Sequence, residues 1–347
     1  MTSKERVRIA LLHQEPDRTP VNATYTPEIA ALLRQKFGEH DDIGVTMGND
    51  MVIVSSGRGF ETSYYRQGDS YVCDYGIGWK RVTFGKGSYT EMVERPLSGD
   101  KSKLASWNPP DPFEPTQYDT LKRKMDVYGK TMWMVASITC TLFETAWALR
   151  GMEELLIDMV EDEDYAHTLF DKVMFQPLHA GLTGVKLGAD MLWMGDDIAV
   201  QMGMLMSPDT FRKYLKPRFT YMIAEYRKVN PDIKIAYHTC GNPFLVLDDI
   251  IEMGVDIYHS IQPKAIDPLE VKRRYGDRLS LWGGLDIQHI LPFGTPEEIK
   301  AETGRLIQGC AGGGGYIVAP AHHIQPDTPL ENILAFYDAA KEYGSYH

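Results

Sequence analysis

The sequence predicts an α/β fold, a (β/α)8 TIM-type barrel with an antiparallel β insertion in its N-terminal part. Three observations support this fold class. Short apolar runs alternate with helical stretches, the runs number eight, and polar residues follow directly after them. Such alternation indicates βαβ units on a parallel sheet, and eight units fit a barrel, although a doubly wound open sheet would use the same units in smaller number. We expect residues 1–347 to form one domain.

The predicted strands are apolar runs bounded by turn residues. A short helix at 4–12 comes first, and a Pro-rich turn then leads into the first strand, which begins at Val21. From 64 to 94, aromatic and β-branched residues alternate with polar ones, which predicts an antiparallel insertion at about 60–95. The other strands are expected at 51–54, 132–138, 190–194, 233–237, 255–259, 279–282 and 316–318.

The predicted helices of the second half share a start signal. Several have proline in the first turn, where its missing N–H costs nothing, after a Ser, Asp or Thr that can cap the helix. They are expected at 208–229, 243–253, 268–275, 296–308 and 329–343.

Composition limits the classes of partner. The 48 acidic and 36 basic residues give a net charge of −12, which repels nucleic acid and anionic lipid surfaces. No run approaches the roughly 18 apolar residues of a membrane helix, and the first residues lack the apolar core of a signal peptide, so we expect a cytoplasmic protein. The four cysteines have no paired spacing, so a special cysteine is expected to be chemical rather than structural.

The residues that follow each strand are the candidates for chemistry, because the catalytic groups of a (β/α)8 barrel lie at the carboxyl ends of its strands. Polar side chains collect there. In chain order they are Cys140 with Glu144 beyond it, Asp196 and Asp197, His238 and Cys240, His259 and Gln262, Asp286, and the pair His322 and His323.

His238 and Cys240 are the most specific of these candidates. One imidazole and one thiolate two residues apart in an extended chain can face the same point and bind a borderline-soft ion such as zinc. His322 or His323 can supply a third ligand, and Glu144, a water or a substrate thiolate a fourth. The alternative interpretation is a partly buried histidine beside an inert core cysteine.

Four carboxylates have both a functional and a structural interpretation. Asp196 and Asp197 share one loop, where they can act as acid and base or orient a substrate; the alternative is a helix cap with a solvated charge. Glu144 lies near the start of a helical stretch, where the helix dipole favours a carboxylate in any case. Asp286 has the same two interpretations, and we treat it as a candidate for substrate binding.

Five segments, taken in order, form a specific pattern. They are Glu5-Arg-Val-Arg-Ile-Ala-Leu-Leu-His-Gln-Glu-Pro-Asp-Arg-Thr-Pro, Gly195-Asp-Asp with Ser207-Pro-Asp-Thr-Phe, His238-Thr-Cys240-Gly, Trp282-Gly-Gly-Leu-Asp286, and Ile324-Gln-Pro-Asp-Thr-Pro-Leu-Glu-Asn. In this pattern the chain resembles, over nearly its whole length, the uroporphyrinogen decarboxylase superfamily. That superfamily includes cobalamin-dependent methyltransferases that act with corrinoid proteins.

The resemblance to the decarboxylase branch lacks one element. That branch places Arg-Gln-Ala-Gly-Arg after the first strand, where the arginines bind the acidic side chains of the porphyrinogen. Here the stretch is Asn22-Ala-Thr-Tyr25-Thr-Pro-Glu, without arginine. An acidic protein without these counter-ions does not suit a substrate with many carboxylates. We expect Tyr25, with Gln262 and Asp286, to contact a different substrate.

The methyltransferase branch holds zinc through a His-x-Cys pair and a cysteine near the last strand. His238 and Cys240 match the pair, while His322 occupies the place of the final cysteine. The resemblance therefore implies a zinc-dependent transfer of a methyl group between a corrinoid protein and a small molecule, which is a thiol, a folate or a methoxylated compound. The chain contains no Asp-x-His-x-x-Gly, so we expect the cobalamin on a separate corrinoid protein.

Two other functions remain open at this point. A histidine at 322 also fits a metal-independent lyase that decarboxylates a smaller acid, with Asp196, Asp197 or His322 moving the proton. A non-catalytic protein that binds a corrinoid or a tetrapyrrole is the third candidate. A homodimer is a further candidate assembly.

Overall fold

The computed structural model describes residues 1–60, 68–85 and 87–346 and contains a parallel sheet of seven strands. Each strand of this sheet pairs with the next one along the chain, in the order β1-β5-β6-β9-β10-β11-β12, which confirms the predicted α/β class. All seven begin within two residues of the predicted positions. Their bounds are β1 (Met51–Ser55), β5 (Trp133–Ser137), β6 (Met191–Gly195), β9 (Lys234–His238), β10 (Ile257–Ile261), β11 (Ser280–Leu285) and β12 (Tyr316–Pro320).

The eighth predicted strand, beginning at Val21, is not a regular strand. The segment makes isolated parallel bridges to the β12 side, Val21 with Val318 and Tyr25 with Ile324. On the β1 side, the N–H of Asp50 donates to the carbonyl oxygen of Val21 at 2.8 Å. Pro20 has no N–H, and the N–H of Val21 is used by the Asp50 carboxylate, so no continuous ladder forms. The segment nevertheless lies between the two edge strands.

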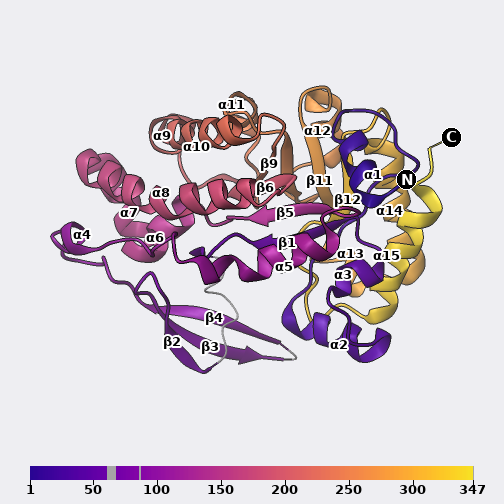
Figure 1. Cartoon of the computed structure of the whole chain (residues 1–347), viewed down its shortest axis with the longest axis horizontal. Helices are drawn as coiled ribbons and strands as arrows, with labels where there is room; N and C mark the ends of the chain where they lie inside the picture. Colours follow the sequence, from indigo (N-terminus) through magenta and orange to yellow (C-terminus); the bar gives the residue numbers. More distant parts are fainter. Residues whose placement is uncertain (61–67, 86, 347) are drawn as a thin grey trace.

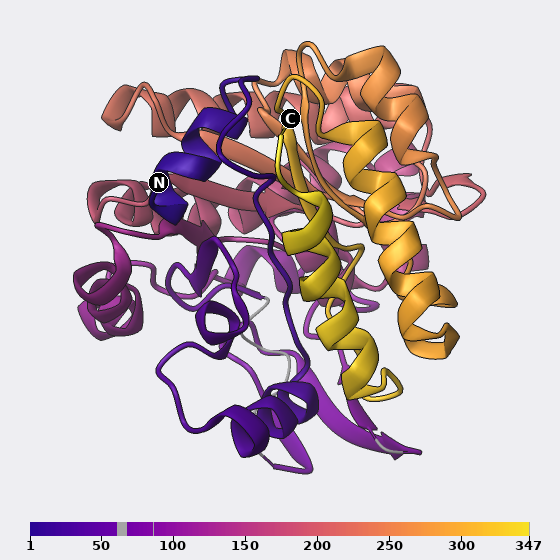
Figure 2. The same cartoon turned by 90° about the vertical axis from the view of Figure 1, so that its right-hand side faces the viewer.

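Most helices surround the sheet, and both termini lie on the same side of the molecule (Figure 1). Figure 2 shows α14 and α15 running side by side. The helices are α1 (Ser3–Ala10), α2 (Pro27–Phe37), α3 (Ile43–Met47), α4 (Lys103–Ser106), α5 (Asp119–Tyr128), α6 (Phe143–Arg150), α7 (Met152–Glu161), α8 (Glu163–Lys186), α9 (Pro208–Tyr214), α10 (Lys216–Val229), α11 (Leu247–Glu252), α12 (Pro268–Tyr275), α13 (Ile290–Phe293), α14 (Pro296–Cys310) and α15 (Leu330–Tyr343), with 3-10 turns at η2 (Pro115–Tyr118) and η3 (Phe244–Val246).

One predicted helix is divided in two. The single helix expected at 208–229 is α9 followed by α10, with Leu215 between them. Pro217 explains the break, because proline cannot donate to the carbonyl four residues earlier and its ring clashes there. The helix expected at 243–253 begins with the 3-10 turn η3 before α11, whereas α12 begins and ends at the predicted residues.

The insertion is antiparallel where the structure describes it. It comprises β2 (Ser70–Val72), β3 (Gly78–Phe84) and β4 (Gly87–Glu94), which project from the parallel sheet (Figure 1). The predicted range of about 60–95 also includes 61–67 and residue 86, which lie outside the described residues. A second, smaller hairpin follows β6 and consists of β7 (Ala199–Val200) and β8 (Gly203–Met204).

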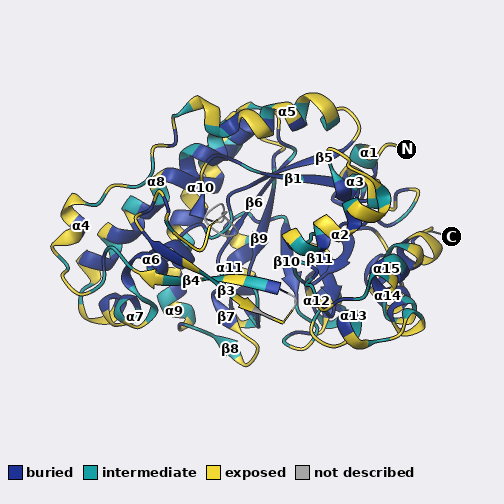
Figure 3. Cartoon of the chain, turned by 90° about the horizontal axis from the view of Figure 1, so that it is seen from below, coloured by how far each residue is buried: buried dark blue, intermediate teal, exposed yellow. Residues whose placement is uncertain are grey.

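The strands are buried on both faces (Figure 3). On one face a compact cluster joins α1 to inward side chains of the sheet, including Trp133, Trp193 and Trp282. The other face packs against the surrounding helices in the larger cluster. Among the described residues, every helix is too short or too polar to cross a bilayer.

Candidate metal centre

The carboxyl ends of β9 and β12 bring the predicted metal ligands together. Side chains alternate along a strand, so His238 points to the same face of the sheet as Ala236, which belongs to the tryptophan-rich cluster. The nitrogen and sulfur ligand atoms of His238, Cys240 and His322 all lie within 4.8 Å of one another. The sequence could place these residues only near the same end of the sheet, and the structure brings them to one point.

The spacing of these atoms suits zinc. Nε2 of His238 lies 3.8 Å from Sγ of Cys240. Tetrahedral zinc, with bonds of about 2.0 Å to nitrogen and 2.3 Å to sulfur, would place two such ligands about 3.5 Å apart. The two side chains therefore need to move only slightly, and two imidazoles with one thiolate are a donor set that zinc accepts.

His322 needs a larger adjustment than the other two. Its Nδ1 accepts a hydrogen bond from the backbone N–H of His323 at 2.8 Å, so the proton of a neutral ring lies on Nε2. Binding a metal through that ring requires this hydrogen bond to break or the ring to turn. Burial and the neighbouring His238 lower the pKa of His322 to about 4, so the ring is neutral, as a metal ligand must be.

Asp197 lies directly beside the cluster. Its Oδ1 is 3.3 Å from Nε2 of His238 and accepts the backbone N–H of Cys240 at 2.7 Å. Burial alone would raise the pKa of Asp197, but the hydrogen bonds from His238 and the Cys240 backbone lower it to about 2. Burial, together with the same carboxylate, raises the pKa of the Cys240 thiol. A cation at this point would lower the pKa of the Cys240 thiol and would further favour the ionised form of Asp197.

Glu144 connects to Asp197 from the start of α6. Its carboxylate accepts the backbone N–H of Asp197 at 3.2 Å. Burial and the charges of Asp197 and Asp196 raise the pKa of Glu144 well above its usual range. The pKa values of two neighbouring carboxyl groups are thus shifted in opposite directions, that of Glu144 upwards and that of Asp197 downwards. In the part of the chain that the structure describes, neither pairs with lysine or arginine.

Asp196 has a structural position. It is completely buried, and its oxygens accept the N–H groups of Leu142 and Glu144 at 3.0 Å, at the start of α6. Burial raises its pKa to about 6 although these N–H groups favour the anion. The sequence prediction placed it among catalytic residues, but its contacts are those of the alternative interpretation, a helix cap.

Two glycines allow this close packing. Gly195, at φ 120°, ends β6, and a Cβ there would lie 2.3 Å from the carbonyl oxygen of His238. Gly241, at φ 77°, follows Cys240, and a Cβ there would lie 2.6 Å from the backbone of Ala199. Only glycine fits both the positive φ and the contact, so these positions fix the loops that carry Asp197 and Cys240.

The three predicted substrate contacts lie in different places. Gln262 borders the site, because its Oε1 accepts the N–H of Gly241 at 2.8 Å. Asp286 turns back on its own loop and accepts the N–H groups of Gln288 and His289 at 2.6 and 3.1 Å. Tyr25 pairs its hydroxyl with that of Tyr337 on α15. The structure therefore does not bring Tyr25 or Asp286 into contact with the metal ligands.

His259 is a part of the site that the sequence analysis counted among the strand-end candidates but to which it assigned no role. Its Nδ1 lies 2.8 Å from Nδ1 of His238, and the two residues are partners in the register of β9 and β10. Burial and the neighbouring histidines lower the pKa of His259 well below its usual range, so it is neutral. Its position two residues after Ile257, an inward residue, is the signal that could have identified it.

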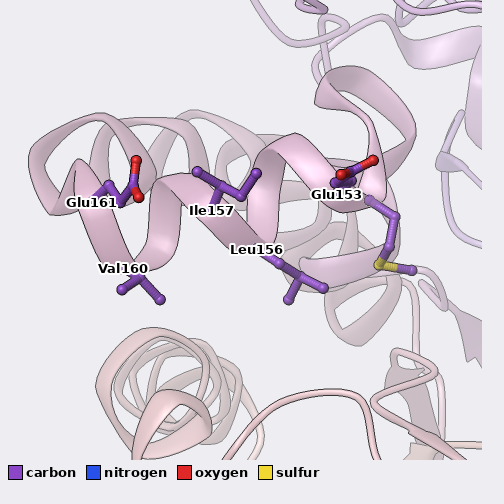
Figure 4. A pocket seen from close by; sticks show the side chains of 6 residues that line it. Glu153, Leu156, Ile157, Val160 and Glu161 are labelled. Atoms are coloured by element: carbon purple, nitrogen blue, oxygen red, sulfur yellow. The ribbon is translucent and has the colours of Figure 1, made fainter.

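A hollow of about 630 Å³ lies away from this cluster, along α7 (Figure 4). All six residues that line it belong to that helix, among them Leu156, Ile157 and Val160. Its lining contains two glutamates but no histidine or cysteine, so it offers none of the chemistry of the strand ends.

Comparisons with known proteins show the family to which the chain belongs. A family model described as Uroporphyrinogen decarboxylase (URO-D) matches residues 74–343. The methylcobamide:CoM methyltransferase MtaA of Methanosarcina barkeri is 35% identical over 159 residues, 46% of this chain and 43% of the relative. The methylated-thiol–coenzyme M methyltransferase of Methanosarcina mazei is 26% identical over 229 residues, 65% and 56% of the two chains. The uroporphyrinogen decarboxylase of Coxiella burnetii is 26% identical over 187 residues, 53% and 49%.

These matches span about half the length of the curated relatives. A solved structure of a methyltransferase from Methanosarcina mazei is similar over 99% of both chains, with a TM-score of 0.74 and 22% identity. At that identity the likeness concerns the fold, and it extends over the sheet, the helices and the described part of the insertion.

Proposed function

Because this chain belongs to the uroporphyrinogen decarboxylase family, we propose that it is a zinc-dependent methyltransferase that moves a methyl group between a corrinoid protein and a small molecule. The observation that carries the proposal is the convergence of His238, Cys240 and His322 within 4.8 Å. The similarity to two relatives named as methyltransferases supports it. The cobalamin is carried by a separate protein, and no nucleic acid or membrane takes part.

We infer that residues 1–347 act as one (β/α)8 barrel domain with an insertion at about 60–95. The segment from Val21 to Tyr25 supports this, since its bridges to the β12 side and its contact with Asp50 fill the gap between the edge strands. The proposed site then lies at the mouth, at the carboxyl ends of the strands. Cys73, Cys240 and Cys310 form no disulfide, and we place the reaction in the reducing cytoplasm.

In the proposed mechanism, zinc bound by His238, Cys240 and His322 would act as a Lewis acid on the heteroatom of a thiol, ether or alcohol. Glu144, whose raised pKa favours the acid form, donates a proton to that heteroatom when the methyl group passes to the corrinoid, and its ionised form takes the proton up when the methyl group returns from the corrinoid. Asp197 stays ionised, orients the Cys240 loop through the backbone N–H and offsets positive charge. Asp196 holds the start of α6, and with it Glu144, in place.

The donor set favours one class of small molecule. Two neutral imidazoles and one thiolate leave zinc more electrophilic than two thiolates would, which suits an ether or alcohol oxygen. Gln262, beside the Cys240 loop, is the proposed substrate contact. Assays that compare methoxylated donors with thiol acceptors test this preference. Equal turnover of thiols and no activity with methoxylated donors would contradict it.

The first test is metal content. We expect purified, chelator-washed protein to retain about one zinc per chain. Methyl transfer with a methylated corrinoid should stop when zinc is stripped by a strong chelator and should return when zinc is added. Elemental analysis and a spectroscopic assay of the corrinoid measure both. A fully active protein without metal would overturn the proposal, and decarboxylation of a small acid by that metal-free protein would establish the lyase.

The second test concerns Glu144. Glu144→Gln keeps the size of the side chain and an oxygen that can accept the Asp197 N–H, but it cannot transfer a proton. We expect turnover to fall by about 10²- to 10⁴-fold while zinc content is unchanged. Steady-state kinetics and metal analysis of the same preparation measure the two quantities. Glu153→Gln, on α7 beside the hollow, is the matched control and should keep full activity. Unchanged turnover in Glu144→Gln would remove this residue from the mechanism.

A further inference from the structure

His259 is a buried ring in direct contact with a proposed zinc ligand, but it is not itself one of the three ligands. Its Nδ1 faces Nδ1 of His238 at 2.8 Å. Two neutral imidazole nitrogens at that distance share one proton, so one ring donates and the other accepts. The direction of this hydrogen bond depends on whether Nε2 of His238 carries a proton or binds a metal.

A metal on His238 would determine that direction. Nε2 of His238 is the nitrogen nearest Cys240, at 3.8 Å from Sγ, and a metal would use its lone pair. The proton of a neutral His238 must then lie on Nδ1, which donates to Nδ1 of His259. His259 in turn carries its proton on Nε2. Metal-bound histidines almost always donate their other N–H to an acceptor, which is usually a carboxylate or a carbonyl.

Two tryptophans hold the His259 ring in the orientation that this requires. The ring centroid lies 4.9 Å from that of Trp193, at an interplanar angle of 89°, and 4.3 Å from that of Trp282, at 48°. Neither indole N–H has a hydrogen-bond partner within the described ranges, so neither is bonded to a His259 ring nitrogen. The packing therefore restricts rotation of the ring and keeps Nδ1 directed at His238.

We propose that His259 is a positioning residue: it accepts the Nδ1–H hydrogen bond of His238 and so directs Nε2 of His238 at the metal. This inference rests on the proposed zinc site. It extends that site beyond its ligands to a histidine pair that connects the metal to the tryptophan-rich interior of the sheet.

The test compares two substitutions of His259. His259→Phe keeps an aromatic ring between the tryptophans but cannot accept a hydrogen bond, and we expect zinc to bind about 10- to 100-fold more weakly. His259→Asn places a side-chain oxygen close to the position of Nδ1 and should restore most of the lost affinity. Competition with a chromogenic chelator gives the zinc affinity of the whole protein, without any activity assay. Thermal unfolding of the metal-free proteins shows whether each variant is folded.

Tyr258→Phe is the matched control, because Tyr258 is buried on the same strand and its hydroxyl has no partner among the described residues. Its zinc affinity should equal that of the wild type. Zinc binding by the wild type with unchanged affinity in His259→Phe would overturn this inference alone, as would equal losses in the Phe and Asn variants. A wild type that binds no zinc would overturn the proposed function and this inference together.

Discussion

Cys240→Ala is expected to abolish zinc binding and to lower methyl transfer by more than about 100-fold, since even a change behind the ligands costs 10- to 100-fold in metal sites. Cys240 supplies the one thiolate of the three proposed ligands. Without it, His238 and His322 offer two neutral nitrogens beside Asp197, which is a much poorer zinc site. Burial and Asp197 raise the pKa of the Cys240 thiol, so its ionised form needs a nearby cation. The alanine variant has no thiol that a cation could ionise.

The measurement is elemental analysis of the chelator-washed variant, followed by the corrinoid assay. Cys310→Ala is the control: Cys310 is also a free cysteine, but it is buried at the end of α14. It should retain zinc and activity. Zinc content equal to that of the wild type in Cys240→Ala would remove Cys240 from the site. Loss of zinc with full activity would separate the metal from the reaction and refute the mechanism.

The sequence indicated the candidate metal ligands, whose side chains the structure groups together, because the chemistry of the His-x-Cys pair is local. In a His-x-Cys pair at the end of a strand, both side chains point to the same face, independently of the rest of the chain. The roles of Asp196 and His259 depend on neighbours far away in sequence. Asp196 became a cap because α6 begins against it, and His259 joined the site because β10 lies in register with β9. The contacts of Asp196 leave no signal in a single sequence, whereas for His259 the sequence shows only its inward position, two residues after Ile257, and not its partner.

The fold also has some features that the sequence predicts locally and others that depend on contacts between distant residues. The seven regular strands were predictable because each is an apolar run buried on both faces. The segment at Val21 has the same apolar character, but Pro20 has no N–H and the N–H of Val21 donates to the Asp50 carboxylate. These two groups are therefore missing from a strand ladder. Pro217 was visible in the sequence, and its effect on the helix at 208–229 follows from its missing N–H. The contact between the hydroxyls of Tyr25 and Tyr337 on α15 likewise joins residues far apart in sequence, and the substrate contact at Tyr25 stays a prediction.

Asp50 is expected to be the largest single contributor to stability at the seam between β1 and the Val21 segment. Its carboxylate is fully buried and bonds Arg6 at 2.7 Å and Arg18 at 2.8 Å. It also accepts the hydroxyl of Ser3 and the N–H of Val21, at 2.7 and 2.9 Å. One side chain thus joins α1, the Val21 segment and β1, in place of the strand pairing that Pro20 prevents.

Asp50→Ala should lower the free energy of unfolding by about 3–5 kcal/mol, because it leaves the buried Arg6 without that carboxylate. Urea denaturation measures the loss. Glu270→Ala, which breaks an exposed pair with Arg273, is the control and should cost less than about 1 kcal/mol. The seam should also open locally: hydrogen exchange of the Val318 N–H, which donates to Pro20, should accelerate more than exchange in β9. If Asp50→Ala lowers the free energy of unfolding no more than Glu270→Ala does, the seam is held by packing. The Asp50 carboxylate would then only fill space.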